Sequence, residues 1–308
     1  MKPVEQHRRR NSRKWPLLLM ALPGIVYFLI NNYIPMLGMF IAFKDVNYAK
    51  GIFASDWVGF KNFEFLFRTK DAFIITRNTL LYNIVFVILN LIVGIALAIM
   101  INEVLSKVKK KVYQTFVLVP YLISMVIVGY LVYALLSGET GFINNRILRP
   151  LGLKEINWYS EPKYWPFILC LVNTWKNGGY YCIIYLASIV SIDTSYYEAA
   201  TLDGATDWQK ILHITLPTIL PVIITMTFLQ IGKIFNSDFG LFYQVTMDSG
   251  MILDATNVID TYVYRGLMKL GDIGMSAAAG MYQSVVGCFI VVLTNAIVKR
   301  FSRENAMF

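Results

Sequence analysis

Long apolar stretches alternate with shorter polar ones along almost the whole chain. Six apolar blocks are long enough to be membrane-spanning helices, because a helix needs about 20 apolar residues to cross roughly 30 Å of hydrocarbon. Asn31, Asn32 and Pro35 interrupt the first block, which predicts a bend near its far end. The pattern therefore predicts an all-α, polytopic membrane protein with one six-helix domain over residues 16–298. The blocks lie at about 16–43, 74–102, 113–137, 164–190, 211–235 and 273–298.

The composition agrees with a membrane protein. Of the 308 residues, 56% are hydrophobic and 15% are charged, whereas a soluble domain carries about 25% charged residues. The formal net charge of +9 is scattered between apolar blocks and forms no single basic face, so nucleic acid is not expected as a partner. Cys170, Cys182 and Cys288 all lie inside apolar blocks without paired spacing, which indicates small buried hydrophobic side chains.

Basic residues mark one side of the predicted membrane domain. The tail 1–15, the link 102–112 and the tail 299–308 are rich in Lys and Arg, and short segments of this kind face the cytoplasm. Six crossings return both termini to the same side, so the two tails and the polar stretch at 191–210 are predicted to be cytoplasmic. The basic start is not expected to be a cleaved signal, because the apolar run is too long and lacks an A-x-A-like site. Binding of its arginines to nucleic acid or lipid headgroups is the less favoured alternative.

The polar stretch 191–217 carries the clearest local folding signals. Ser195 followed by Glu198 fits a capping box, in which each residue satisfies a free backbone N–H at the start of a helix. Gly204 is suited to end that helix, because glycine adopts the left-handed conformation without steric cost. The sequence therefore predicts a short helix that ends at a glycine turn.

A second helix is predicted to follow the glycine. Thr206 with Gln209 forms another capping box, which opens a helix that continues into the fifth apolar block. The first helix exposes Ala199 and Ala200, and small side chains let another backbone approach closely. The stretch 191–217 is therefore expected to be a helix–glycine–helix elbow with a docking surface.

The elbow resembles a known signature. Membrane subunits of bacterial ABC importers carry the EAA signature, in which Glu-Ala-Ala is followed after three residues by Gly and after nine more by I-x-L-P. The similarity to the sugar-permease branch of this family extends over nearly the whole chain, and the stretch 258–283 resembles permeases for complex oligosaccharides. Every signature position is filled here, by Glu198, Ala199, Ala200, Gly204, Ile214, Leu216 and Pro217.

The resemblance implies a fold, partners and roles. It implies a type I ABC importer permease fold in the bacterial cytoplasmic membrane, with the first elbow helix as the coupling helix. A separate cytoplasmic ATPase, in two copies, would bind ATP and Mg and dock on the elbows, so this chain is expected to hold no cofactor and to be no enzyme. A second homologous permease would complete the pathway, and an extracytoplasmic solute-binding protein would deliver an oligosaccharide. The residues expected to couple to the ATPase are Glu198, Ala199, Ala200, Asp203, Gly204 and Asp207.

Other chemistry is missing from the sequence. There is no G-x-x-x-x-G-K-[ST] loop, and His7 and His213 stand alone, which argues against nucleotide binding by that route and against metal or histidine-based catalysis. No apolar block holds Asp or Glu in its interior, whereas proton-driven and many sodium-driven carriers bind the coupling ion through carboxylates within the membrane. A stand-alone carrier or membrane receptor stays open as the alternative, because backbone carbonyls can also bind sodium. An ABC permease for a non-sugar solute is the nearer competitor.

Polar side chains inside the apolar blocks are candidates for a transport pathway. The richest segment is 173–180, where Trp175 and Tyr180 offer flat faces for sugar rings and amides can bind hydroxyl groups. Gly178 and Gly179 allow close backbone approach there. Hydrogen bonding between helices is an equally open role for each polar group, and pairing with a backbone carbonyl is open for the lysine of this segment. The pathway candidates are Asn83, Asn90, Trp175, Lys176, Asn177, Tyr180, Gln230 and Gln283.

Two lysines bear on the charge of the solute. If Lys176 and Lys233 both lined the route, they would favour an acidic oligosaccharide such as a uronate. Asp238 closely follows Lys233, however, and a local ion pair between them is the simpler expectation. A neutral oligosaccharide is therefore the first expectation, with a uronate-containing one as the alternative.

Overall fold

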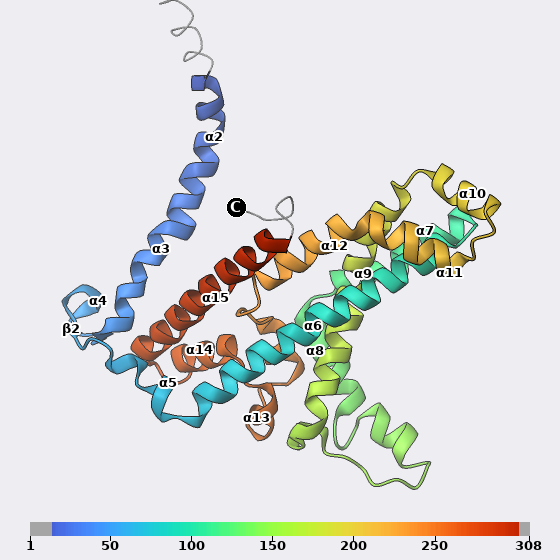
Figure 1. Cartoon of the computed structure of the whole chain (residues 1–308). Coiled ribbons are helices and arrows are strands. Elements are labelled where there is room, and N and C mark those ends of the chain that lie inside the picture. The colour runs from blue at the N-terminus through green and yellow to red at the C-terminus, as the bar shows by residue number, and fades with distance from the viewer. Residues whose placement is uncertain (1–13, 302–308) are drawn as a thin grey trace, which may run out of the picture.

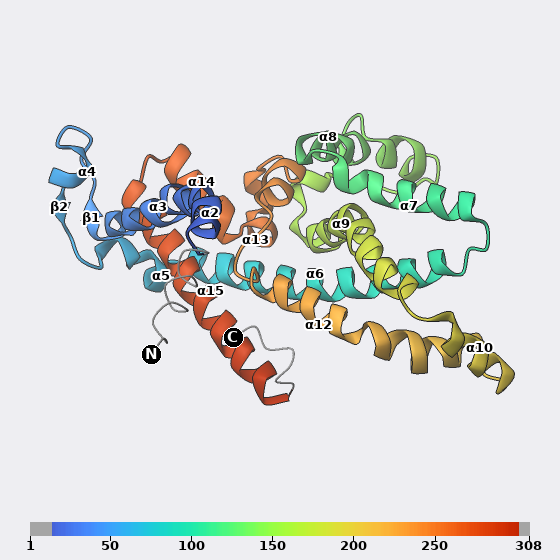
Figure 2. The same ribbon diagram turned by 90° about the horizontal axis from the view of Figure 1, so that it is seen from above.

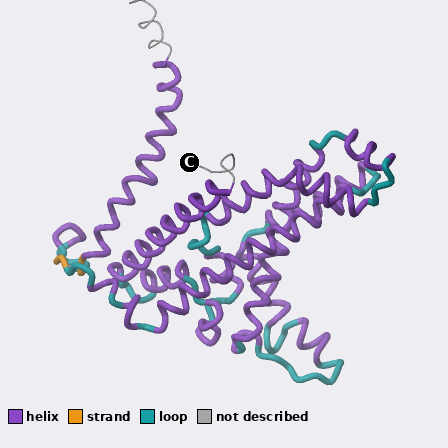
Figure 3. The backbone as a smooth tube through the Cα atoms, in the orientation of Figure 1, coloured by secondary structure: helices purple, strands orange, loops and turns teal. Residues whose placement is uncertain are grey.

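The computed structural model describes residues 14–301, and almost all of the regular structure in this range is helical (Figures 1 and 3). The exception is an antiparallel pair of two-residue strands, β1 (Lys44–Asp45) and β2 (Asp56–Trp57). The predicted all-α membrane fold is confirmed. The basic tail before residue 14 and the last residues, 302–308, lie outside the described residues.

Four helical segments within residues 14–301 are long and apolar enough to span a membrane, and a bent helix pair makes a fifth. The 26-residue helix α9 (Trp165–Val190) has sufficient length but falls outside these candidates by composition. Each of the six expected blocks therefore forms helix. The four segments are Trp15–Phe43, Lys70–Asn102, Asp207–Ile231 and Ile273–Ala296.

The first span stands apart from the rest of the chain (Figure 1). It runs through α2 (Lys14–Phe28), a π-helical turn (Leu29–Tyr33), α3 (Ile34–Leu37) and a 3₁₀ segment (Gly38–Phe43). Its most apolar window has no buried residues, and its 3₁₀ segment packs against α15 (Ile273–Phe301). The bend expected at Asn31, Asn32 and Pro35 is a local change of helical geometry, and the helix continues beyond it.

The third expected block does not form one straight helix. It consists of α7 (Lys107–Leu122) and α8 (Met125–Leu136), which meet at 95°. The chain leaves the helical conformation at Ile123 and Ser124, and the Ser124 hydroxyl accepts a hydrogen bond from the Ile127 N–H to cap α8. A continuous span over 113–137 is therefore wrong, because a serine cap restarts the helix in its middle.

Helix α9 lies between α6 (Lys70–Asn102) and α7, with glycines at both contacts. A Cβ atom on Gly179 would lie 1.8 Å from the carbonyl oxygen of Val117, and a Cβ atom on Gly94 would lie 2.8 Å from the Tyr181 Cβ. Main chain therefore meets main chain on the α7 side. The buried side chains Tyr185 and Leu186 fill the rest of this core together with Ala98.

The long connections between spans contain short helices of their own. Helix α14 (Ile259–Met268) packs along α15, and Asp248 forms ion pairs with Arg265 and Lys269 to tie the preceding loop to it. The remaining α-helices are α4 (Gly51–Ala54), α5 (Phe65–Arg68), α10 (Thr194–Leu202), α11 (Asp207–Lys210), α12 (Leu216–Ile231) and α13 (Leu253–Thr256). Further 3₁₀ and π-helical turns lie at Lys61–Phe63, Ile143–Leu148, Trp158–Ser160, Pro162–Tyr164, Ile211–Thr215, Leu241–Val245 and Gly250–Ile252.

The strand pair and the elbow mark opposite ends of the molecule. Helix α10 lies at the opposite end from the β1–β2 pair in both views (Figures 1 and 2). Helix α6 begins near α5 and extends toward the α10 end, so the link after α6 and the elbow share one end, as predicted.

The contact at Gly179 makes a direct stability prediction. Gly179→Ala places a methyl group against the α7 main chain, and overpacking of this kind costs about 1–3 kcal/mol. Gly280→Ala is the matched control, because its Cβ atom would meet nothing within 4 Å and alanine in a helix is favoured over glycine by roughly 0.5–1 kcal/mol. Thermal unfolding in detergent should show a lower midpoint for Gly179→Ala and no loss for Gly280→Ala. Equal midpoints would contradict the close α7–α9 contact.

Candidate functional site

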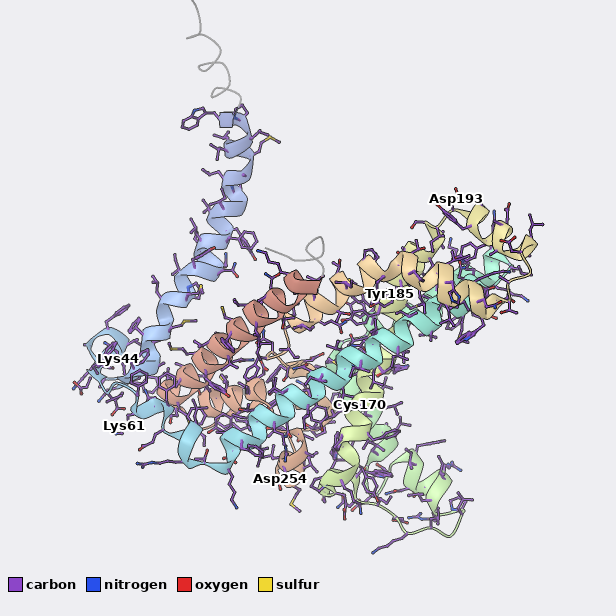
Figure 4. All side chains as sticks on the ribbon, in the orientation of Figure 1. Lys44, Lys61, Cys170, Tyr185, Asp193 and Asp254 are labelled. Atoms are coloured by element: carbon purple, nitrogen blue, oxygen red, sulfur yellow. The ribbon has the colours of Figure 1, made fainter. Side chains whose placement is uncertain are left out.

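The elbow is a helix–glycine–helix unit, as predicted, with one corrected cap. Helix α10 begins at Asp193, whose carboxylate accepts the Ser195 N–H at 2.9 Å; this bond lowers the pKa of Asp193. The expected capping box of Ser195 with Glu198 is therefore wrong, because the carboxylate two residues earlier takes the role. Figure 4 shows Asp193 at the far end of the molecule.

Gly204 ends α10 as expected. Its φ is +80°, a conformation that L side chains rarely adopt, while the Ala205 N–H donates to the Ala200 carbonyl at 2.9 Å. A Cβ atom on Gly204 would meet nothing within 4 Å, so backbone conformation and not space requires the glycine. The Thr206–Gln209 capping box is confirmed and opens α11, which continues through the π-helical turn Ile211–Thr215 into α12.

The predicted coupling residues lie on an open surface of the elbow. Glu198, Ala199, Asp203, Gly204 and Asp207 are exposed, and Ala200 is half-buried. A groove of about 380 Å³ runs beside them. Its lining residues are Ala200, Asp203, Gly204, Ala205, Gln209, Lys210, His213 and Ile214.

Sequence reasoning missed the large apolar side chains of this surface. Leu202 is 90% exposed at the end of α10, and Tyr196 and Trp208 are also exposed. Exposed apolar groups beside acidic ones are the composition expected of a protein contact. The sequence signal that could have located this surface is the presence of these three large apolar residues within the polar stretch 191–210.

The elbow is braced against the membrane helices at its base. The Tyr197 and Thr215 hydroxyls lie 2.9 Å apart and join α10 to the turn before α12. A second cavity, of about 220 Å³, is lined by Asn102 and Glu103 from the end of α6 together with Lys210. The base of the elbow therefore lies beside the end of α6 and is hydrogen bonded to the turn that leads into α12.

A larger cavity, which we name the amide cavity, lies between α6, α9, α12 and the loop 232–238. Its volume is about 540 Å³. Five of the eight pathway candidates line it: Asn83, Asn90, Asn177, Tyr180 and Gln230. The other lining residues are Phe86, Val87, Tyr121, Asn173, Tyr181, Met226, Leu229, Lys233, Asn236, Ser237 and Asp238.

The amides of the cavity also hydrogen bond between helices. Asn177 donates to Asn173 at 2.9 Å, and Asn173 donates to Asn90 across the α6–α9 contact at 3.3 Å. Interhelical bonding and cavity lining are therefore two roles of the same side chains. Such a chain fixes each amide while leaving unused donor and acceptor positions for a ligand.

Three pathway candidates do not line the amide cavity. Trp175 is 46% exposed elsewhere on α9. Lys176 is buried, and its ammonium group donates to main-chain carbonyls, which is the alternative left open for it. Gln283 donates to the Phe235 carbonyl at 2.7 Å and to the Asn236 side chain at 2.9 Å.

The loop 232–238 is held in place by half-buried polar side chains. Asn83 donates to the Ile234 carbonyl at 2.8 Å, and the Asp260 carboxylate accepts the Ser237 N–H at 2.7 Å and the Gln283 amide at 3.2 Å. Burial is the main cause that raises the pKa of Asp260, against the hydrogen bonds that lower it. Gln283 therefore does not line the amide cavity, but it helps to fix the position of the loop that does.

The charged and aromatic groups of the cavity suit a particular ligand class. No ion pair among residues 14–301 joins Lys233 to Asp238, so the expected local pair is absent and both side chains are exposed. The Tyr121 and Tyr180 rings stack with centroids 4.8 Å apart and 16° between their planes. Amides, a cation and flat rings together suit a hydroxyl-rich solute.

The family model of the binding-protein-dependent transport system inner membrane component matches residues 90–303, which include the elbow and most of the amide cavity. The chain belongs to this family. It is therefore a multi-pass membrane subunit of a binding-protein-dependent transport system and is no enzyme itself. Within the pattern described above, Glu198, Ala199 and Ala200 lie on α10, whereas Leu216 and Pro217 lie on α12.

Several relatives of this transport component handle acidic polysaccharides. The chain is 37% identical over 294 residues to the polygalacturonan/rhamnogalacturonan transport system permease protein YteP of Bacillus subtilis, covering 94% of this chain and 89% of that protein. It is 35% identical to the permease in a crystal structure of a bacterial ABC transporter involved in the import of the acidic polysaccharide alginate; coverage is 96% and 99%, and the TM-score is 0.86. A second structure of an alginate transporter, in complex with an alginate pentasaccharide-bound periplasmic protein, matches with 35% identity, coverage of 96% and 97%, and a TM-score of 0.85. These relatives confirm the sugar and oligosaccharide branch.

Asp260 makes a pH prediction for this transport component. Because burial raises its pKa above the usual 3.8, the native state binds this proton more tightly than the unfolded chain does. Its stabilising contribution is present below the usual pKa and is lost as pH rises through the raised pKa. Asp260→Asn removes this titration, so the thermal midpoint of the wild type should fall relative to that of Asp260→Asn as pH rises from about 4 to 7. Parallel midpoint curves would contradict the burial of this carboxyl group.

Proposed function

We propose that this permease imports oligosaccharides that carry carboxylate groups and that the amide cavity is their binding site in the membrane. The observation that carries the proposal is a cavity lined by a chain of amides, a stacked tyrosine pair and Lys233, which forms no ion pair within residues 14–301. Names of two relatives support the acidic character, since polygalacturonan and alginate are built of uronates. The neutral oligosaccharide expected from the sequence depended on a Lys233–Asp238 pair, and the structure lacks that pair.

The proposed complex contains four further subunits. A second homologous permease supplies the other half of the pathway, and two copies of a cytoplasmic ATPase, which bind ATP and Mg, dock on the elbows. A solute-binding protein delivers the oligosaccharide from outside the cell. The alginate transporter in complex with a periplasmic protein supports the delivery step. In this arrangement both termini and the elbow face the cytoplasm.

The elbow transmits the ATPase movement in this proposal. Its exposed Leu202 and Trp208 and its acidic groups form the contact. Because α11 runs without a break into α12, displacement of the elbow reaches the Gln230 side of the amide cavity. Contacts at the elbow must differ in strength between the inward-facing and outward-facing states, since equal docking would shift no population.

Lys233 provides the test of substrate class. A carboxylate paired with Lys233 gains a charge-assisted hydrogen bond of about 1.5–3 kcal/mol. Lys233→Gln should therefore weaken binding of tetragalacturonate by roughly tenfold or more. Its methyl ester should bind equally to both proteins, and Lys233→Arg should keep the acidic preference. Binding is measured by equilibrium dialysis on the full complex in nanodiscs, without the solute-binding protein. An equal loss of affinity for both ligands would contradict recognition of the carboxylate by Lys233.

Gly204 provides the test of coupling. Holding an L residue in the left-handed backbone conformation costs roughly 1–2 kcal/mol of conformational energy, and more if the residue is β-branched, whereas asparagine tolerates this conformation. Gly204→Val should therefore distort the elbow and abolish ATP-driven uptake by proteoliposomes, while the matched Gly204→Asn retains most of it. Normal expression and membrane insertion of both variants serve as the control. Wild-type uptake by Gly204→Val would remove the elbow from the mechanism.

A further inference from the structure

Lys176 occupies the point where the broken span turns. It lies on α9 with 8% of its surface exposed. Its ammonium group donates to the carbonyl oxygens of Pro120 at 3.3 Å, Tyr121 at 3.1 Å and Ile123 at 2.5 Å. All three acceptors belong to the end of α7 or to the residues that connect it to α8.

These carbonyls need a partner because the helix stops. The last carbonyls of a helix have no N–H four residues ahead, and the C-terminal end carries partial negative charge. Here the chain becomes extended at Ile123 and α8 leaves at 95°. The Ile123 N–H donates to the Pro120 carbonyl at 3.3 Å, which leaves the Tyr121 and Ile123 carbonyls to other donors. Lys176 forms no ion pair among residues 14–301. Its ammonium group supplies three N–H donors to these carbonyls, and the Asp238 carboxylate favours its charge from beyond ion-pair distance.

Lys176 also lies next to an aromatic residue that lines the amide cavity. Tyr121 is one of the residues whose carbonyl it binds, and its ammonium group lies 5.9 Å from the Tyr121 ring centroid. That ring stacks on Tyr180, which lies one helical turn beyond Lys176 on α9. Tyr121 and Tyr180 both line the cavity, and Lys176 does not.

We infer that Lys176 is a positioning residue for substrate binding: it clamps the α7–α8 break and so holds the Tyr121 ring against Tyr180 as a platform for a sugar ring. The inference rests on the proposed function of the amide cavity. Lys176 acts through Tyr121, and its ammonium group is engaged by the main chain and not by the carboxylate of a solute. Gly179 supports the clamp, because it lets α7 lie directly on α9 three residues further along.

The experiment separates the clamp from substrate contact. Lys176→Met keeps the length and volume of the side chain but removes its donors, whereas Lys176→Arg keeps charge and donors. Hydrogen exchange of the full complex in nanodiscs, without ligand, reports on residues 120–127. Lys176→Met should speed exchange there at least tenfold, and Lys176→Arg should restore most of the protection. Should the Met variant not be recovered, Lys176→Gln, which keeps two donors without the charge, is expected to give an intermediate rate.

Binding of tetragalacturonate and its methyl ester gives the second readout. Lys176→Met should weaken both ligands about equally, by roughly tenfold, and Tyr121→Leu should do the same without faster exchange at the break. Unchanged exchange in Lys176→Met would overturn the clamp, and faster exchange with unchanged binding would overturn the positioning role. Loss of the acidic ligand alone would assign Lys176 to direct substrate contact, which also overturns the inference. If the wild type bound neither ligand, the proposed function would fail, and exchange would still decide the clamp because it needs no ligand.

Discussion

Every main-chain polar group inside a membrane must find a partner within the protein, because hydrocarbon offers none. This constraint explains the most distinctive contacts of the chain. At the α7–α8 break the partner is a lysine ammonium group, and at the loop 232–238 the partners are Asn83, Gln283 and Asp260. At the turn before α12, the Thr215 hydroxyl donates to the Lys210 carbonyl. At each of these three places, a polar side chain from the same or another element meets the freed groups.

The amide cavity is a consequence of these departures. Lys233, Asn236, Ser237 and Asp238 line it from the loop that follows the end of α12 at Ile231, and Tyr121 lines it from the last turn of α7. Continuous helices would have kept these groups in regular rows along the spans. The polar groups that repair each break thus also hold the ligand-facing side chains in place.

Local features of this fold could be predicted from the sequence, and long-range partners could not. Hydropathy located all six blocks, and the Thr206–Gln209 box and the Gly204 turn depend on residues within one helical turn of each other. The sequence predicted the cap at Ser195 although the structure has it at Asp193, because both residues suit the role and only two positions separate them. The carbonyls that Lys176 binds lie more than fifty positions earlier in the chain. No periodicity connects such groups, so the sequence alone left open whether Lys176 meets solute or main chain.

The absence of a side chain at Gly179 limits which parts of the cavity can move. At Gly179 the α7 main chain rests directly on α9, so the side chains that join the two helices, Lys176 and the Tyr121–Tyr180 pair, lie to either side of a fixed main-chain contact. Helix α12 differs, because it is continuous with the elbow and its half-exposed Met226 and Gln230 face the amide cavity. In the proposed transport cycle, displacement of the elbow would therefore reach the amide cavity through α12, while the contact at Gly179 keeps the α7 and α9 walls at a fixed separation.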